Sequence, residues 1–340
     1  MAPAAQALAW MLAGTVLGAV VTALARAYAL RRRLVDLPGE RRSHQAATPR
    51  GGGVSIVLVL LAAGGILAVV APGERPACLL AGAGLLLVAG IGWLDDHRPL
   101  PAWPRLCVHA LSAALLAAAA WSRGGDALDV SVAFASALVL VNVWNFMDGI
   151  DGIAAMQALV VAVAWAMLAG AGPVWWLGLA LAAGALGFLP FNFPRARIFL
   201  GDVGSGALGY GLAMLFTVGS QGGGPVARVL WVLPLLPFLV DASLTLALRI
   251  LAGEAWWRPH VRHAYQVWAR TLGSHVPVTL AYAAAAVLAS MLMFLVRSGT
   301  SVIIIAACST FLAVGALAWN RLRGASPVDG STDELGRRNR

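Results

Sequence analysis

Apolar stretches long enough to cross a membrane recur along the whole chain, and this feature restricts the fold more than any other. Hydrophobic residues make up 60% of the 340 residues and charged residues only 11%, with a mean hydropathy of +0.81. Soluble domains carry roughly a quarter charged residues, so this composition cannot provide a water-facing surface. A helix needs about 20 apolar residues to span a bilayer. The sequence therefore predicts an all-α, polytopic integral membrane protein.

About eleven apolar segments are expected to form transmembrane helices, at residues 5–30, 52–71, 77–94, 106–122, 131–147, 153–170, 174–191, 204–220, 227–248, 276–296 and 301–319. The breaks between these segments are of two alternating kinds. One kind is polar and mostly long, at 31–51, 95–105, 148–152, 192–203, 249–275 and 320–340; the other kind is short and has few charged residues. The long breaks contain 19 arginines and the short breaks about four, and the chain has no lysine. Because positive residues stay in the cytoplasm, we expect the N-terminus outside and the C-terminus inside. One membrane domain, 1–322, is expected, followed by a disordered cytoplasmic tail, 323–340.

Acidic residues gather at the predicted cytoplasmic ends of these helices. A charge at the centre of a membrane helix costs about 2.5–3.5 kcal/mol on insertion scales, so carboxylates delivered to one face suggest a functional demand. The pair Asp95–Asp96 ends the third segment. Arg98 and Arg105 follow it and suit phosphate oxygens. A solvated helix end is the alternative for an isolated acidic pair.

The segment NVWNFMDGIDG places four polar side chains three residues apart: Asn142, Asn145, Asp148 and Asp151. On a continuous helix this spacing puts them on one face. Such a stripe at the end of an apolar helix favours a bound ligand. A simple helix-ending turn is the alternative.

The segment FNFPRARIFLGDVGSG, residues 191–206, combines a break, positive charge and an acidic helix start. Pro194 should end the seventh helix, and Arg195 and Arg197 supply charge for phosphate. Asp202 lies among glycines where the eighth helix begins. A carboxylate there can hold Mg²⁺ while backbone N–H groups face phosphate.

The last long loop contains WWRPHVRHAYQ, residues 256–266. His260, Arg262 and His263 can donate hydrogen bonds to a diphosphate. An aromatic belt at the membrane interface with an incidental histidine is the alternative. His97, His109 and His275 have no such companions and are interpreted as structural. The role of Asp241, inside the ninth segment, stays open.

These motifs, in this order, resemble those of the polyprenyl-phosphate N-acetylhexosamine-1-phosphate transferases, a glycosyltransferase family 4 type. The resemblance covers most of the chain, from LVDLPGERRSHQAATPRGGG at 34–53 to HVRHAYQ. It implies a phosphotransferase that moves a sugar-1-phosphate from a UDP-N-acetyl sugar to undecaprenyl or another polyprenyl phosphate, releases UMP and initiates cell-envelope glycan synthesis. It also implies Mg²⁺, for which Mn²⁺ substitutes, an active site on the cytoplasmic face of the plasma membrane, and compatibility with a homodimer.

Together, the residue patterns and the positions matched by the resemblance imply roles for fourteen residues of this chain. The implied metal ligands are Asp202 and Asn145. The implied catalytic residues are Asp95, Asp96, Asp148, Asp151 and His263. The implied substrate-binding residues are His44, Arg105, Asn142, Asn192, Arg197, His260 and Arg262.

The chain departs from the family pattern in two places. Arg105 stands where many members have lysine, which keeps the charge and changes its geometry. His263 is followed by Tyr265 and Gln266 in place of two further histidines. This version resembles a subgroup that uses 6-deoxy N-acetyl sugars, such as FucNAc or QuiNAc, for O-antigen.

Two other functions compete with this one. A secondary transporter or lipid flippase would carry charges and broken helices near mid-membrane. Pro234, Pro237 and Asp241 support that reading, whereas the acids at helix ends disfavour it. A CDP-alcohol phosphotransferase would need a DGxxAR…GxxxDxxxD pattern, which is not found. The sequence contains no basic helix with interleaved aromatic residues, so it does not predict a nucleic-acid partner.

Overall fold

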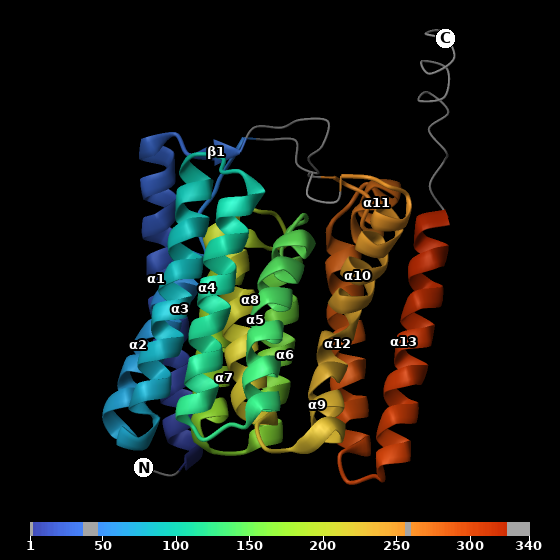
Figure 1. The fold of residues 1–340 in the computed structure, drawn as a ribbon. Helices are drawn as coiled ribbons and strands as arrows, with labels where there is room; N and C mark the ends of the chain where they lie inside the picture. The colour runs from blue at the N-terminus through green and yellow to red at the C-terminus, as the bar shows by residue number, and fades with distance from the viewer. Residues whose placement is uncertain (1–2, 37–46, 256–259, 325–340) are drawn as a thin grey trace, which may run out of the picture.

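A computed structural model describes residues 3–36, 47–255 and 260–324 of the chain. Over these residues the protein is a bundle of helices with one small ladder of two strands (Figure 1). The helices are α1 (Pro3–Arg32), α2 (Val54–Val70), α3 (Arg75–His97), α4 (Ala102–Ser122), α5 (Ala127–Met147), α6 (Ile153–Ala169), α7 (Gly172–Asn192), α8 (Gly201–Ser220), α9 (Gly224–Val232), α10 (Leu236–Leu251), α11 (Ala264–Leu272), α12 (Val276–Val296) and α13 (Ser301–Gly324). The antiparallel strands are β1 (Val35–Asp36) and β2 (Thr48–Pro49). Two 3-10 turns are η1 (Pro72–Glu74) and η2 (Leu233–Leu235).

Each of the eleven predicted segments coincides with a helical stretch of the described chain. By length and composition, nine helical stretches of these residues can cross a membrane. The helices α2 and α6 are apolar but shorter, with 17 residues each. The predicted all-helical, polytopic membrane protein is therefore confirmed. The predicted tail begins inside α13, and its residues 325–340 lie outside the described part.

The predicted segment 227–248 lies within one membrane-length helical stretch, Gly224–Leu251, which is interrupted near its two prolines. This stretch consists of α9, the turn η2 and α10. Pro234 lies in η2, and Pro237 lies in the first turn of α10. Proline has no N–H to donate and clashes with the preceding turn, so it interrupts a helix interior. The added helix α11 lies in the predicted cytoplasmic loop.

The central helix of the bundle is α8, which packs against α3 and α5 and is almost wholly buried. Its first two turns read GDVGSGALG, and such small residues let neighbouring membrane helices approach closely. Large side chains fill the core around it, including Trp144, Trp165 and Phe188. The indole N–H groups of Trp144 and Trp165 donate to the carbonyls of Ala154 and Trp231, so burial leaves neither unpaired. The first residues of α8 are thus held inside the bundle.

The polar connections gather at one end of the bundle. The helix α1 begins at the lower end in Figure 1, and α13 ends at the upper end. The upper end also carries β1 and α11, together with the last turn of α3 and the first turn of α8. The described parts of the long polar breaks therefore lie at the upper end of the bundle, and the short breaks lie at the lower end.

Candidate active site

A cavity of about 240 Å³ lies at the upper end of the bundle and is lined mainly by polar groups; we call it the polar cavity. Five aspartates line it, and four of them come from the three acidic segments singled out in the sequence: Asp96, Asp148, Asp151 and Asp202. The remaining lining residues are Asp36, Arg50, Asn145, Gly149, Ile150, Asn192, Phe199, Leu200, Gly201, Val261, Gln266 and Arg270. The predicted convergence of distant carboxylates at one end is confirmed.

Asp96 joins the last turn of α3 to the first turn of α8. Its Oδ1 accepts a hydrogen bond from the backbone N–H of Asp202 (3.0 Å), and its Oδ2 accepts one from Val203 (3.2 Å). The first N–H groups of a helix have no partner within it and carry partial positive charge. Asp96 therefore caps α8 from another helix, an arrangement we call a cross-helix cap. Gly201 has a φ of +75°, and a Cβ there would lie 2.4 Å from Asp96 Oδ2, so this position requires glycine.

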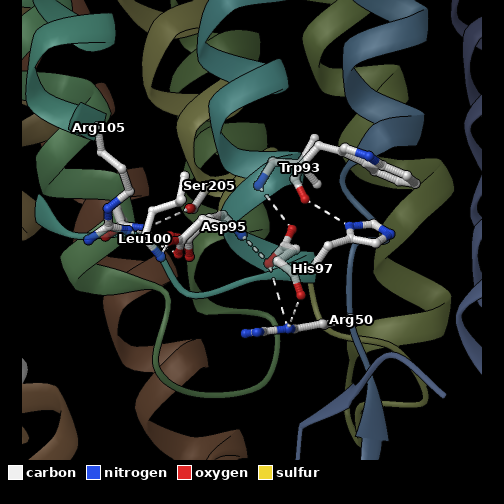
Figure 2. A network of polar contacts seen from close by, with 11 residues as sticks. Arg50, Trp93, Asp95, His97, Leu100, Arg105 and Ser205 are labelled. Atoms are coloured by element: carbon white, nitrogen blue, oxygen red, sulfur yellow. Dashed lines mark hydrogen bonds and ion pairs between the residues drawn. The ribbon is translucent and has the colours of Figure 1, made fainter. Parts of the chain in front are cut away.

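Asp95, the neighbour of Asp96, contacts Arg105 (Figure 2), and the same guanidinium contacts Asp202. Arg105 Nη1 donates to Asp95 Oδ2 at 3.2 Å and to Asp202 Oδ2 at 2.5 Å. The other oxygen of Asp95 accepts from the N–H of Leu100 at 2.6 Å. The guanidinium lowers the repulsion between the two carboxylates. The prediction that Arg105 belongs to the site stays open, but its position beside both acids agrees with it.

Arg50 belongs to the site and was not predicted from the sequence. It follows β2, and its Nε donates to the backbone carbonyl of Asp96 (3.0 Å) and lies 3.9 Å from Asp96 Oδ1 (Figure 2). His97 has a structural place, as expected: its ring packs on Trp93 with centroids 4.1 Å apart, and its Nδ1 lies 2.8 Å from the Trp93 carbonyl. The sequence signal for Arg50 was its place in TPRGGG, directly before α2.

The four-residue stripe predicted for NVWNFMDGIDG is only half formed. Helix α5 ends at Met147, so Asp148 is its C-cap and Asp151 lies in the following turn. The turn runs through Gly152, whose φ is +78°. Asn145 stays on the helix, and its Nδ2 donates to Ser205 Oγ at 3.2 Å. The turn still delivers both aspartates to the polar cavity.

Asp148 lies among other acids and forms no ion pair with any residue that the structure describes. Burial, followed by the nearby carboxylates of Asp202, Asp96 and Asp151, raises its pKa to about 8. Removal from water and like charge both disfavour the ionised carboxyl. A cation entering the polar cavity would therefore gain favourable interactions with several acids at once.

Two side chains fasten the turn after α5 to the loop between α7 and α8. Asp151 Oδ2 accepts from the N–H of Ala196 (3.1 Å), and the Asp151 N–H donates to His275 Nδ1 (3.3 Å). Asn192 Oδ1 accepts from the N–H of Gly152 (2.8 Å), and its Nδ2 donates to the Ile198 carbonyl (2.9 Å). Both predicted residues therefore line the cavity and also hold its wall in place.

We expect Asn192→Ala to lower the stability of the fold by about 2 kcal/mol. The change leaves the Gly152 N–H and the Ile198 carbonyl unpaired in a buried place. The apparent midpoint of thermal unfolding in detergent measures the effect. Asn142→Ala is the matched control, because the Asn142 amide donates only to the Leu138 carbonyl of its own helix. Equal midpoints for the two variants would contradict the fastening role.

A second cavity, of about 290 Å³, adjoins the polar cavity; we call it the histidine cavity. Its apolar wall is made by Trp103, Leu106, Phe146 and Leu246. Its polar groups are Arg105, His109, Asn142, Asn145, Asp148, His260, His263, Tyr265 and Gln266. Four residues belong to the walls of both cavities: Asn145, Asp148, Gly149 and Gln266.

The predicted histidines lie in this second cavity. The rings of His260 and His263 stack with centroids 4.8 Å apart. Burial lowers the pKa of His260 to about 4, and the neighbouring His263 acts in the same direction. His260 is therefore neutral at pH 7 and can accept a hydrogen bond as well as donate one.

Some predicted residues lie apart from both cavities. Arg197 is exposed, donates to the Pro190 carbonyl at 2.5 Å and lies over the Phe191 ring. Arg262 is exposed and forms an ion pair with Glu254. His44 lies outside the described residues. Conversely, Gln266 and Arg270 line the polar cavity without having been predicted as site residues, although Gln266 belongs to the HAYQ motif.

Comparisons with known proteins agree with this arrangement. Residues 78–220 match the model of glycosyl transferase family 4. The chain is 32% identical over 307 residues to the decaprenyl-phosphate N-acetylglucosaminephosphotransferase of Mycobacterium leprae, covering 76% of each chain. It is 27% identical to the undecaprenyl-phosphate alpha-N-acetylglucosaminyl 1-phosphate transferase of Thermotoga maritima, over 74% of this chain and 79% of the relative.

A further relative is the phospho-N-acetylmuramoyl-pentapeptide-transferase of Moorella thermoacetica, which is 36% identical over 51% of this chain and 63% of its own length. The family match contains α8 and the two acidic segments before it, and so covers the centre of the polar cavity. The chain therefore belongs to glycosyl transferase family 4, among the polyprenyl-phosphate N-acetylhexosamine-1-phosphate transferases.

Proposed function

We propose that this protein transfers an N-acetylhexosamine 1-phosphate from a UDP-sugar to a polyprenyl phosphate and releases UMP. The product is a polyprenyl-diphospho-sugar that begins a cell-envelope glycan. The distribution of arginines supports placing the polar end of the bundle on the cytoplasmic face of the plasma membrane. The Mycobacterium leprae and Thermotoga maritima relatives are named for decaprenyl and undecaprenyl phosphate, which supports an acceptor of this class.

The shared wall of the two cavities is the observation that carries this proposal. The polar cavity, with its acids and the arginines Arg50 and Arg270, suits a nucleotide diphosphate. The histidine cavity has an apolar wall beside Arg105 and His260, which suits the phosphate end of an isoprenoid lipid. The two substrates would then meet at Asp148, which lines both cavities.

The residues of the polar cavity fit a Mg²⁺ ion that is also held by substrate. Magnesium usually binds one or two protein carboxylates and completes its shell with water and phosphate oxygens. Asp202, Asp148 and Asn145 offer oxygen ligands around one space. Among the described residues no cluster of three or more His, Cys, Asp or Glu side chains could hold a metal ion by itself. Asp202, Asp148 and Asn145 would hold the ion, which would offset negative charge on the diphosphate.

The chemistry asked of the chain itself is mainly positioning. An oxygen of the lipid phosphate attacks the β-phosphorus of the UDP-sugar, and the bond from that phosphorus to the bridging oxygen breaks, so that UMP leaves. A phosphate monoester has a second pKa near 6 and is mostly dianionic at neutral pH, so a strong base is not obligatory. Arg105 sits between Asp95 and Asp202, where its charge can stabilise phosphoryl oxygens.

The proposal is tested by UMP release from proteoliposomes that contain the protein and undecaprenyl phosphate. The panel of donors includes UDP-GlcNAc and the 6-deoxy sugars UDP-FucNAc and UDP-QuiNAc, because the HAYQ motif resembles the subgroup that uses them. We expect release with at least one donor, dependent on the lipid and on Mg²⁺. If no donor yields UMP above liposomes without protein, the proposed reaction is wrong.

Magnesium binding has a readout that needs no turnover. We expect Mg²⁺ together with UDP to raise the apparent unfolding temperature, because ligands that bind the folded state stabilise it. The Asp202→Asn variant should lose most of this rise. Potassium chloride at matched ionic strength is the control for screening. An equal rise in the variant would remove Asp202 from the cation site.

A further inference from the structure

The buried carboxylate of Asp241 in α10 is bonded to the beginning of α11. Asp241 is only 1% exposed. Its Oδ1 accepts from the N–H of Ala264 (2.9 Å), and its Oδ2 accepts from the N–H of Tyr265 (3.0 Å). Ala264 and Tyr265 are the first two residues of α11, so their N–H groups have no partner within that helix.

Other side chains hold this carboxylate in place. Tyr282 of α12 donates to Oδ2 at 2.7 Å, and Thr245 donates to Oδ1 at 3.1 Å from one turn further along α10. The Nδ1 of His263 lies 3.4 Å from Oδ1. Asp241 thus connects α10, α11 and α12 at one point. Its bonding is satisfied within the protein, which gives no support to a role in carrying ions across the membrane.

The helix α11 forms part of the wall of both cavities. Gln266 lines both of them, and Arg270 lines the polar cavity. Tyr265 donates through its hydroxyl to the Phe146 carbonyl near the end of α5 (3.0 Å). Gly149, beside Asp148, fits tightly against this helix, since a Cβ there would lie 2.3 Å from the Tyr265 hydroxyl oxygen. A displacement of α11 would therefore alter the wall on which the two substrates meet.

A helix as short as α11 depends on its anchors. It has nine residues, and isolated helices of that length are unstable in water. Its local cap is a reciprocal pair in which Gln266 Oε1 accepts from the His263 N–H. Asp241 adds a charged cap from the membrane bundle, and charged acceptors at a helix start are stronger than neutral ones.

We propose that Asp241 is a positioning residue that holds α11 so that Gln266 occupies the wall between the two cavities; this inference rests on the function proposed above. Asp241 itself lines neither cavity. It acts through α11, as Asp96 acts on Asp202 through the start of α8. The polar end of the bundle therefore has two cross-helix caps, one at the start of α8 and one at the start of α11.

The first test is hydrogen exchange of the purified protein carrying Asp241→Asn. Asparagine keeps the volume, but its NH₂ group cannot accept from the second backbone N–H. We expect amide hydrogen exchange in residues 261–273 to become about tenfold faster, because the variant loses one buried hydrogen bond to a charged group. Tyr282→Phe is the matched control, because it removes a bond to the same carboxylate and leaves both α11 amides capped. Unchanged exchange in α11, or an equal change in the control, would overturn the proposal.

The second test is a double-mutant cycle on UMP release. We expect Asp241→Asn to lower kcat on the order of 10²-fold, as misplacement of a binding wall does. In a protein that already carries Gln266→Ala, the same change should cost less than about threefold, because residues acting through one another are not additive. Fully additive effects would mean a general structural role and would overturn the proposal.

These two tests separate the proposal from the function on which it rests. If no donor supports turnover, hydrogen exchange still decides whether Asp241 holds α11. If Asp241→Asn does not fold, Ala264→Pro replaces it, because proline at the first helical position removes that N–H and is compatible with helical geometry. Unchanged exchange beyond residue 264 in Ala264→Pro would then overturn the proposal.

Discussion

Asp202→Asn is expected to lower UMP release on the order of 10³-fold while the protein still folds. The carboxylate opens α8 inside the polar cavity and lies 2.5 Å from Arg105. Asparagine keeps the shape but offers neutral oxygen to a cation and to the developing charge on phosphate. Because Asp96 and Asp148 remain close by, losing one negative charge relieves repulsion and should not unfold the protein. Proteoliposome assays at saturating lipid, with size-exclusion profiles of the same preparation, measure both effects.

Asp126→Asn is the control for this experiment. Asp126 also stands at a helix start, where its side chain accepts from the Asp129 N–H at 2.8 Å. It caps α5 at the opposite end from the site, and asparagine is as good a cap as aspartate. Turnover of this variant should match the parent. If Asp202→Asn also stayed within tenfold of the parent, the proposed cation role would be wrong.

The neighbouring pair Asp95 and Asp96 should respond differently to the same substitution. Asp96→Asn is expected to lower turnover by orders of magnitude and stability by about 3 kcal/mol, because both oxygens of this buried carboxylate accept from the start of α8. Asp95→Asn should also lower turnover by orders of magnitude but should have a smaller effect on stability. Its second contact is to Arg105, and the side chains of this pair are more exposed than that of Asp96.

Thermal unfolding in detergent, run beside the UMP assay, distinguishes the two roles. The expected pattern is a fall in both quantities for Asp96→Asn and a fall mainly in turnover for Asp95→Asn. Mild effects of both changes on turnover would remove the acidic pair from the site. Equal unfolding temperatures would mean that the cross-helix cap does not stabilise α8.

The overall architecture could be predicted because a membrane fold depends on local composition. Apolar length alone located eleven segments, each of which is helical in the structure. The spacing of charged residues did not predict their arrangement correctly at the point where a helix ends. Asp148 and Asp151 have the spacing of a helical stripe, but the chain turns at Gly149 and Gly152, and their approach to Asp202 comes from packing of α5 on α8.

The unpredicted parts of the site depend on partners far away in the chain. Arg50 belongs to the site only because β2 lies next to the end of α3. Asp241 could not be interpreted before its partners in α11 were known, since nothing in its own segment shows where its oxygens bond. For Arg197 the local pattern suggested a phosphate contact, whereas its guanidinium bonds to the carbonyl of Pro190.

The wall common to the two cavities has a consequence for kinetics and for inhibitor design. Because Asn145, Asp148, Gly149 and Gln266 face both spaces, the proposed donor and acceptor would be bound at the same time. Initial rates measured against both substrates should then follow a sequential rather than a ping-pong pattern, with no sugar-phosphate attached to the enzyme between steps. A bisubstrate compound, with a uridine half tethered to a prenyl half across this wall, would gain avidity of up to about 10²–10⁴ over either half alone.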